Sequence, residues 1–92
     1  MAAIPLDRTV RRAGVLWRRA GGRILIRRPG DDEVVVLADS AVALWETLEA
    51  ETTVGELVAA LAAAAGAAPE TVGADVQAAL GTLLARRVVE TP

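Results

Sequence analysis

The chain has 92 residues, a net charge of −2, and neither cysteine nor histidine. This length favours one domain around a single core, while the missing side chains exclude disulfides, thiolate metal sites and the usual zinc ligands. The longest fully apolar run, residues 57–65, is too short to span a membrane, and residues 1–6 lack the features of a secretion signal, so we expect a cytoplasmic protein.

The first third of the chain is strongly basic. Residues 1–28 carry eight arginines and one acid, whereas residues 29–92 carry two arginines and eleven acids. The two parts can attract each other on folding, or each can meet a different partner. Residues 1–13 show no apolar period, so we expect a flexible N-terminal arm there and one folded domain over residues 14–92.

A β-hairpin is predicted over residues 15–28. Two apolar runs flank Gly21-Gly22, which suits a two-residue turn that needs positive φ at both positions. This turn places Trp17 opposite Ile26, and both side chains then lie on the core side of the hairpin. The opposite face carries Leu16, Arg18, Leu25 and Arg27.

A third strand is predicted over Glu33–Leu37, after a turn at Pro29-Gly30-Asp31-Asp32. This β-branched run is apolar on both faces. Either the strand is central and buried, or it lies at an edge of the sheet with unpaired backbone groups. The period of the side chains does not separate these two alternatives.

Three helices follow the strands. The first begins at Asp39 or Ser40, the second opens with a capping box from Thr53 to Glu56 and ends at Gly66, and the third has Pro69 in its first turn. Val88–Glu90 adds a short terminal strand. Strands followed by helices indicate an α+β fold, with three strands and then three helices.

Residues for catalysis are scarce. Besides histidine and cysteine, lysine and tyrosine are absent, and Ser40 is the only serine, with no base nearby to activate it. The acids Asp31, Asp32 and Glu33 lack the ligand spacing of a calcium loop and are better explained as a solvated turn. We therefore expect no catalytic residue, no metal and no cofactor, and we predict a binding protein, not an enzyme.

Two kinds of ligand are compatible with this pattern. Three helices and an arginine-rich segment suit nucleic acid, but the last helix carries Glu70 and Asp75 and no basic residue before Arg86, so it would repel phosphates. An extended peptide suits an edge strand, because it satisfies the free backbone groups and places alternate side chains in pockets. Glu33–Leu37 is the candidate strand, with the last helix as the far wall of a groove.

Several segments together resemble PqqD-like proteins, also called RiPP precursor peptide recognition elements. The resemblance lies in Val34–Leu37 with the following Ala38-Asp39-Ser40-Ala41, and in Leu44-Trp45-Glu46-Thr47-Leu48. It continues through Thr53-Val54-Gly55-Glu56-Leu57 and through Asp75-Val76 with Leu80, Leu83 and Leu84. The similar part runs from about Val15 to Glu90.

The resemblance implies a winged helix-turn-helix, with a three-stranded antiparallel sheet followed by three helices. It also implies that the protein binds the leader segment of a ribosomally made precursor peptide. The leader adds as a β-strand beside the third strand, in a groove walled by the third helix. The bound precursor is thereby presented to a maturation enzyme such as a radical SAM protein, a cyclase or a leader peptidase. The implied peptide-binding residues are Glu33, Val34, Val35, Val36 and Leu37 on the strand and Asp75, Val76, Ala79, Leu80 and Leu83 on the helix.

The chain departs from the family pattern at three places. Members dedicated to pyrroloquinoline quinone carry a Pro-Glu-Arg-like segment where this chain has Pro29-Gly30-Asp31-Asp32, which argues against that pathway. Lasso-peptide members usually carry an aromatic residue and a Leu-Asn pair near the third strand. This chain has Leu37-Ala38-Asp39 there, and that subgroup stays open. The last helix ends in Arg86-Arg87, where a glycine is common. A DNA-binding winged helix and a general protein-interaction module stay as alternatives.

Overall fold

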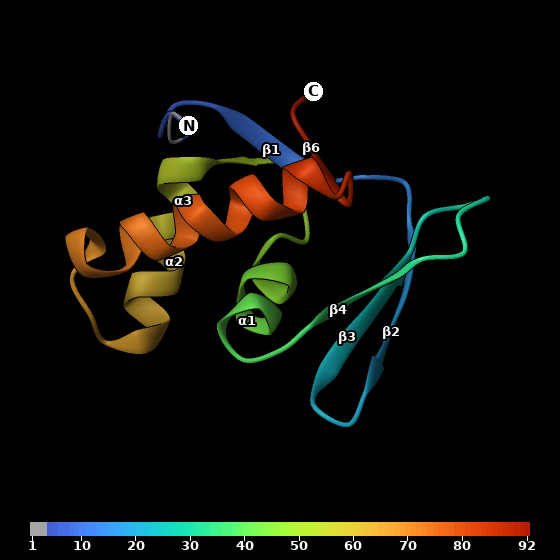
Figure 1. Ribbon diagram of the computed structural model, residues 1–92. Coiled ribbons are helices and arrows are strands. Elements are labelled where there is room, and N and C mark those ends of the chain that lie inside the picture. The colour runs from blue at the N-terminus through green and yellow to red at the C-terminus, as the bar shows by residue number, and fades with distance from the viewer. Residues whose placement is uncertain (1–3) are drawn as a thin grey trace.

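The computed structural model describes residues 4–92, in which long strands precede the helices as expected. The order of elements is β1 (Thr9–Arg12), β2 (Leu16–Ala20), β3 (Arg23–Arg27), β4 (Val34–Leu37), α1 (Ser40–Thr47), β5 (Thr52–Thr53), α2 (Val54–Ala65), α3 (Pro69–Ala85) and β6 (Val89–Glu90). Figure 1 shows α3 crossing over α1, with the β2-β3-β4 sheet to one side. The α+β prediction is confirmed, and the arrangement is compatible with a winged helix-turn-helix.

The larger sheet is antiparallel, with strand order β2-β3-β4. Its hairpin turn has Gly21 at φ 57° and Gly22 at φ 77°, the left-handed values that the two-residue turn requires. Trp17 pairs with Ile26 in the predicted register. The hairpin prediction is therefore confirmed, and β4 lies at an edge of this sheet, not in its centre.

The smaller sheet has the order β5-β1-β6 and was not expected. The first half of β1 pairs with β5 and the second half with β6, and Val10 is completely buried between them. The prediction of an arm without regular structure is wrong for Thr9–Arg12, because strands from residues 52–53 and 89–90 supply its hydrogen-bond partners. The first three residues of that predicted arm lie outside the described residues.

The helix boundaries follow local capping chemistry. Thr53 caps α2, because its Oγ1 accepts a hydrogen bond from the backbone N–H of Glu56 at 3.1 Å. The Glu56 carboxylate accepts a hydrogen bond from the Thr53 hydroxyl at 2.9 Å. In a full capping box it would instead accept one from the backbone N–H of Thr53. Gly66 ends α2 in the left-handed conformation. Asp39 occupies the N-cap position of α1, but its side chain makes no capping hydrogen bond.

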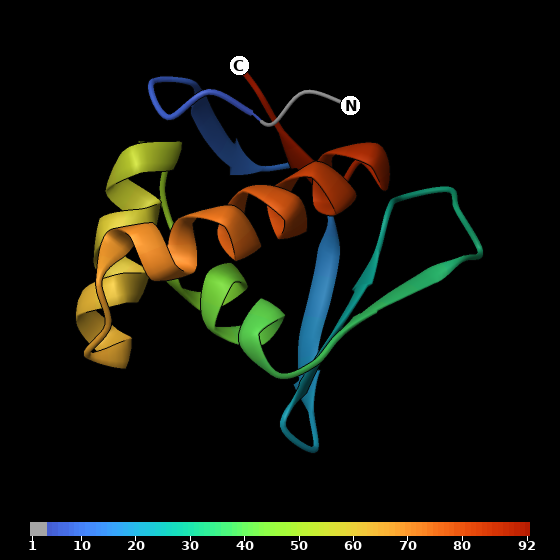
Figure 2. The ribbon, with the colours of Figure 1, turned by 60° about the vertical axis from the view of Figure 1, so that its left-hand side comes forward.

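The core lies where the three helices meet the inner face of the larger sheet, and β1 and β6 close one end of it. Trp45 and Leu80 are among its residues that are inaccessible to solvent. Figure 2 shows the same layers from another side, with α3 again above α1. The buried residues are Val10, Ile24, Ile26, Leu37, Leu44, Trp45, Leu48, Val54, Leu57, Val58, Val76, Leu80, Leu83, Val88 and Val89.

The end of α3 is closed by an arginine where glycine is usual. Arg87 has φ 61°, and its N–H donates to the carbonyl of Leu84 at 3.0 Å. The N–H of Val88 donates to the carbonyl of Leu83 at 3.1 Å, which completes the paired hydrogen bonds of a Schellman motif. A left-handed conformation costs a non-glycine residue about 1–2 kcal/mol, so this turn stores local strain.

We expect Arg87→Gly to raise the free energy of unfolding by about 1 kcal/mol, because glycine adopts a positive φ without steric cost. Urea denaturation at constant m-value measures this change. The neighbouring substitution Arg86→Gly is the matched control. Arg86 has an ordinary φ of −83° and pairs with Glu33, so its replacement should lower stability. Equal effects of the two substitutions would contradict this account of the helix end.

Candidate functional site

The free edge of β4 is the first feature of the candidate site. The hairpin turn makes Ala20 and Arg23 a hydrogen-bonded pair, and such pairs alternate along an antiparallel ladder. The register of β3 and β4 then directs the N–H and C=O groups of Val35 and Leu37 toward β3. The backbone groups of Val34 and Val36 consequently point away from the sheet, where another strand can pair with them.

The side chains of β4 alternate between the two faces of the sheet. Val35 and Leu37 are paired with the buried Ile26 and Ile24, so they lie on the inner face beside the helices. Leu37 is 5% exposed and Val35 is partly buried. Val34 and Val36 lie on the outer face and are 48% and 51% exposed. The strand therefore has two side chains on its inner face, Val35 and Leu37, and two on its outer face, Val34 and Val36.

The five residues implied on α3 include core residues and residues that line a cavity, and Val76 is both. Leu80 and Leu83 belong to the core, with 0% and 3% exposure. Asp75, Val76 and Ala79 line an apolar cavity of about 190 Å³ between the three helices. Its remaining lining residues are Ser40, Ala43, Leu44, Leu61, Ala65 and Val72. An apolar cavity of this size accommodates one large side chain.

The residues at the two ends of β4 show how this strand is connected to α3. At its start, the Glu33 carboxylate lies 2.5 Å from the Arg86 guanidinium at the end of α3. At its end, β4 leads into α1, whose first residue, Ser40, lines the cavity with the first half of α3. Figures 1 and 2 show this course from β4 into α1 beneath α3. The start of β4 is therefore tied to the end of α3, and its end leads to the cavity that α3 lines.

The acidic stretch before β4 has local structural partners. Asp31 lies 3.6 Å from Arg28 and accepts a hydrogen bond from the backbone N–H of Glu33 at 3.0 Å. The turn is closed by the N–H of Asp31 donating to the carbonyl of Arg28, with Gly30 at φ 81°. Such a Pro-Gly turn is a type II turn. These contacts agree with the interpretation of the acids as a turn.

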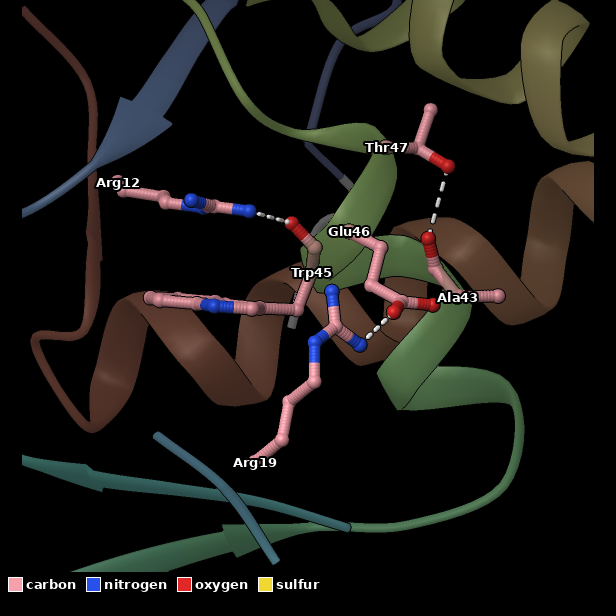
Figure 3. A network of polar contacts seen from close by, with 6 residues as sticks. All are labelled: Arg12, Arg19, Ala43, Trp45, Glu46 and Thr47. Carbon is pink, nitrogen blue, oxygen red and sulfur yellow. Dashed lines mark hydrogen bonds and ion pairs between the residues drawn. The ribbon is translucent and has the colours of Figure 1, made fainter. Parts of the chain in front are cut away.

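Arg12 joins the smaller sheet to α1 and was missed by sequence reasoning. Its guanidinium lies 4.7 Å from the Trp45 ring centre and 4.9 Å from that of Trp17, and it donates a hydrogen bond to the Trp45 carbonyl. Figure 3 shows the guanidinium stacked on the Trp45 ring, with the Arg19–Glu46 ion pair below it. A cation at the last carbonyls of a helix also interacts favourably with the helix dipole.

The surroundings of Arg12 are partly dry. Burial lowers the pKa of its guanidinium, an effect that the Glu49 carboxylate offsets and that Arg19 reinforces. Arginine stays protonated at such a shift. Among residues 4–92, the Arg12 Nε and the Trp45 indole N–H have no hydrogen-bond partner. The contacts with the two rings therefore carry much of the stabilisation of this charge.

The amino-acid sequence matches a known family. Residues 14–89 match the family described as "Coenzyme PQQ synthesis protein D (PqqD)". Comparisons with curated proteins and with solved structures found no match. Within residues 4–92, no helix is both long and apolar enough to cross a membrane.

Proposed function

The chain belongs to the PqqD family, and from this premise we propose that it is a non-catalytic adaptor for the leader of a precursor peptide. Membership assigns it an accessory role in the biosynthesis of pyrroloquinoline quinone or of ribosomally made and modified peptides, in which a precursor peptide and a biosynthetic enzyme are its partners. The proposal adds the mode of binding, which is strand addition to the free edge of β4.

The free edge of β4 is the single observation that carries this proposal. The outward N–H and C=O groups of Val34 and Val36 pair with an extended peptide without regard to its side chains. This backbone ladder gives sequence-tolerant affinity. Each added hydrogen bond contributes about 0.5–1.5 kcal/mol, so two alternating residues supply part of the affinity and leave room for selection by pockets.

Selectivity comes from the side chains beside that edge. The inner side chain of Val35 meets the inward side chains of the peptide. The cavity at Asp75, Val76 and Ala79 takes one large apolar side chain. The exposed carboxylate of Asp75 at this cavity favours a basic residue next to that side chain. The preferred leader is thus an extended segment with an apolar anchor and a neighbouring cation.

The product is a modified peptide and not the quinone coenzyme. This part of the proposal rests on Pro29-Gly30-Asp31-Asp32, which replaces the Pro-Glu-Arg-like segment of members dedicated to the quinone. The replaced stretch forms a type II turn closed by Asp31 and Arg28. The maturation enzyme that receives the leader is a radical SAM protein, a cyclase or a leader peptidase.

The experiment is a titration of the full chain with leader peptides from the short reading frames beside its gene. Trp17 is 38% exposed and touches Trp45, so tryptophan fluorescence and the anisotropy of a labelled peptide are two independent readouts. We expect saturable binding at micromolar concentration or tighter that persists at moderate salt. Binding to duplex DNA, with none to any leader, would instead support the transcription-factor alternative. The exposed acids Glu70 and Asp75 on α3 argue against that outcome, because they would repel the phosphates.

A further inference from the structure

The outer face of the larger sheet carries an exposed apolar patch. Leu16 and Val34 flank Arg27 in one row of the sheet, and Leu25 lies between Arg18 and Val36 in the next. Leu16, Val34 and Val36 are each about half exposed, and no helix packs on this face in the views of Figures 1 and 2. Exposed aliphatic side chains that adjoin one another in this way mark an interaction surface more often than scattered ones do.

Three arginines surround this patch without acidic partners. Elsewhere in the described chain, Arg11, Arg19, Arg28 and Arg86 form ion pairs, and Arg12 stacks on the two tryptophans. Within residues 4–92, the side chains of Arg18, Arg23 and Arg27 form no ion pair or hydrogen bond. Five of the ten arginines are thus engaged within the fold, and three of the other five lie together on one face.

We propose that this face docks a partner protein whose surface has an aliphatic centre and a carboxylate rim, and that the partner is the maturation enzyme. Charge complementarity identifies the rim, because three unpaired cations surround the patch. The aliphatic centre favours protein over nucleic acid, since Leu16, Leu25, Val34 and Val36 offer no ring for base stacking and no donor for phosphate. A symmetric second copy is disfavoured, because it would bring six arginines together.

The outer face is continuous with the proposed peptide site. A strand added to the edge of β4 would extend this sheet by one row, and its outward side chains would lie next to Val34 and Val36. The enzyme would then contact the adaptor and the bound leader on one surface. This inference rests on the proposed function for its partner, whereas the patch and its charges do not depend on peptide binding.

The test uses the full chain and the maturation enzyme encoded beside its gene. The double variant Arg18→Glu/Arg27→Glu reverses the rim, and Arg8→Glu/Arg87→Glu makes the same charge change elsewhere on the exposed surface. We expect the rim variant to weaken enzyme binding at least about tenfold and to flatten its salt dependence. The control variant should stay within about twofold, and both should bind the leader peptide as the wild type does. Leu16→Ser, an uncharged change, should weaken enzyme binding as well.

Equal enzyme affinities of the rim and control variants, with circular dichroism showing both folded, would overturn the proposal. Loss of duplex-DNA binding in the rim variant alone would assign the face to nucleic acid. A wild-type dimer in sedimentation that Leu16→Ser dissociates, without enzyme binding, would assign the face to a second copy. Peptide binding and enzyme binding are measured separately. A variant that loses the peptide but keeps the enzyme, such as Val36→Pro, would show that enzyme docking does not depend on the peptide site. The two proposals can therefore fail independently.

Discussion

Replacing Val36 by proline should weaken leader-peptide binding at least about 30-fold while leaving the domain folded. Proline removes the N–H that points away from the sheet at this position, and its ring obstructs an incoming strand. The peptide carbonyl that would pair with this N–H is left without a partner. The lost hydrogen bond and the unsatisfied carbonyl together cost about 2 kcal/mol of binding free energy, which corresponds to about 30-fold in affinity. Edge strands tolerate proline where the N–H faces away from the neighbouring strand. Peptide anisotropy and circular dichroism measure the two expectations.

The neighbouring residue provides a matched control for this prediction. The N–H of Val35 is directed toward β3 by the register, so Val35→Pro should remove a ladder hydrogen bond and destabilise the domain. Val36→Thr keeps both the N–H and the β-branched shape, and it should bind peptide within about twofold of the wild type. If Val36→Pro binds the leader normally, strand addition at β4 is wrong, whatever else the protein binds.

Replacing Arg12 by alanine should lower the free energy of unfolding by about 3 kcal/mol. The change removes stacking on Trp17 and Trp45, worth about 1–2 kcal/mol. It also removes a charged hydrogen bond to the Trp45 carbonyl, worth about 1.5–3 kcal/mol, and the two losses are not fully additive. Urea denaturation followed by tryptophan fluorescence measures the change.

Arg11 supplies the control for Arg12, since it is its neighbour on β1. Its side chain is 46% exposed and pairs with Glu51 and Glu90 at the surface. Exposed ion pairs contribute about 0–1 kcal/mol, so Arg11→Ala should have only a small effect. Arg12→Met keeps an apolar stem and removes the charge, and it should recover part of the lost stability if burial matters more than the cation. Similar losses for Arg11→Ala and Arg12→Ala would contradict the described role of Arg12.

The sequence predicted residues for the candidate site but not how they are arranged in space. The resemblance implied ten residues, and these include Val34 and Val36, whose backbone the register turns toward the free edge. The same pattern gave no reason to separate Leu80 and Leu83, which are core residues, from Ala79, which lines a cavity. Which residues of α3 are buried and which line the cavity depends on how α1 and α2 pack against α3. The spacing of apolar residues along α3 alone does not reveal that packing.

Local rules determined most of the chain. The two-glycine hairpin, the Thr53 cap and the Gly66 helix end each follow from short-range chemistry, because a turn or a cap needs only a few adjacent residues. The order of strands before helices, and hence the α+β class, followed from these elements. Only the tertiary structure decided that β4 is an edge strand, that Thr9–Arg12 pairs with β5 and β6, and that Arg12 stacks on two tryptophans. Each of these depends on partners distant in sequence, and a polar four-residue strand or a single arginine carries no period that reveals them.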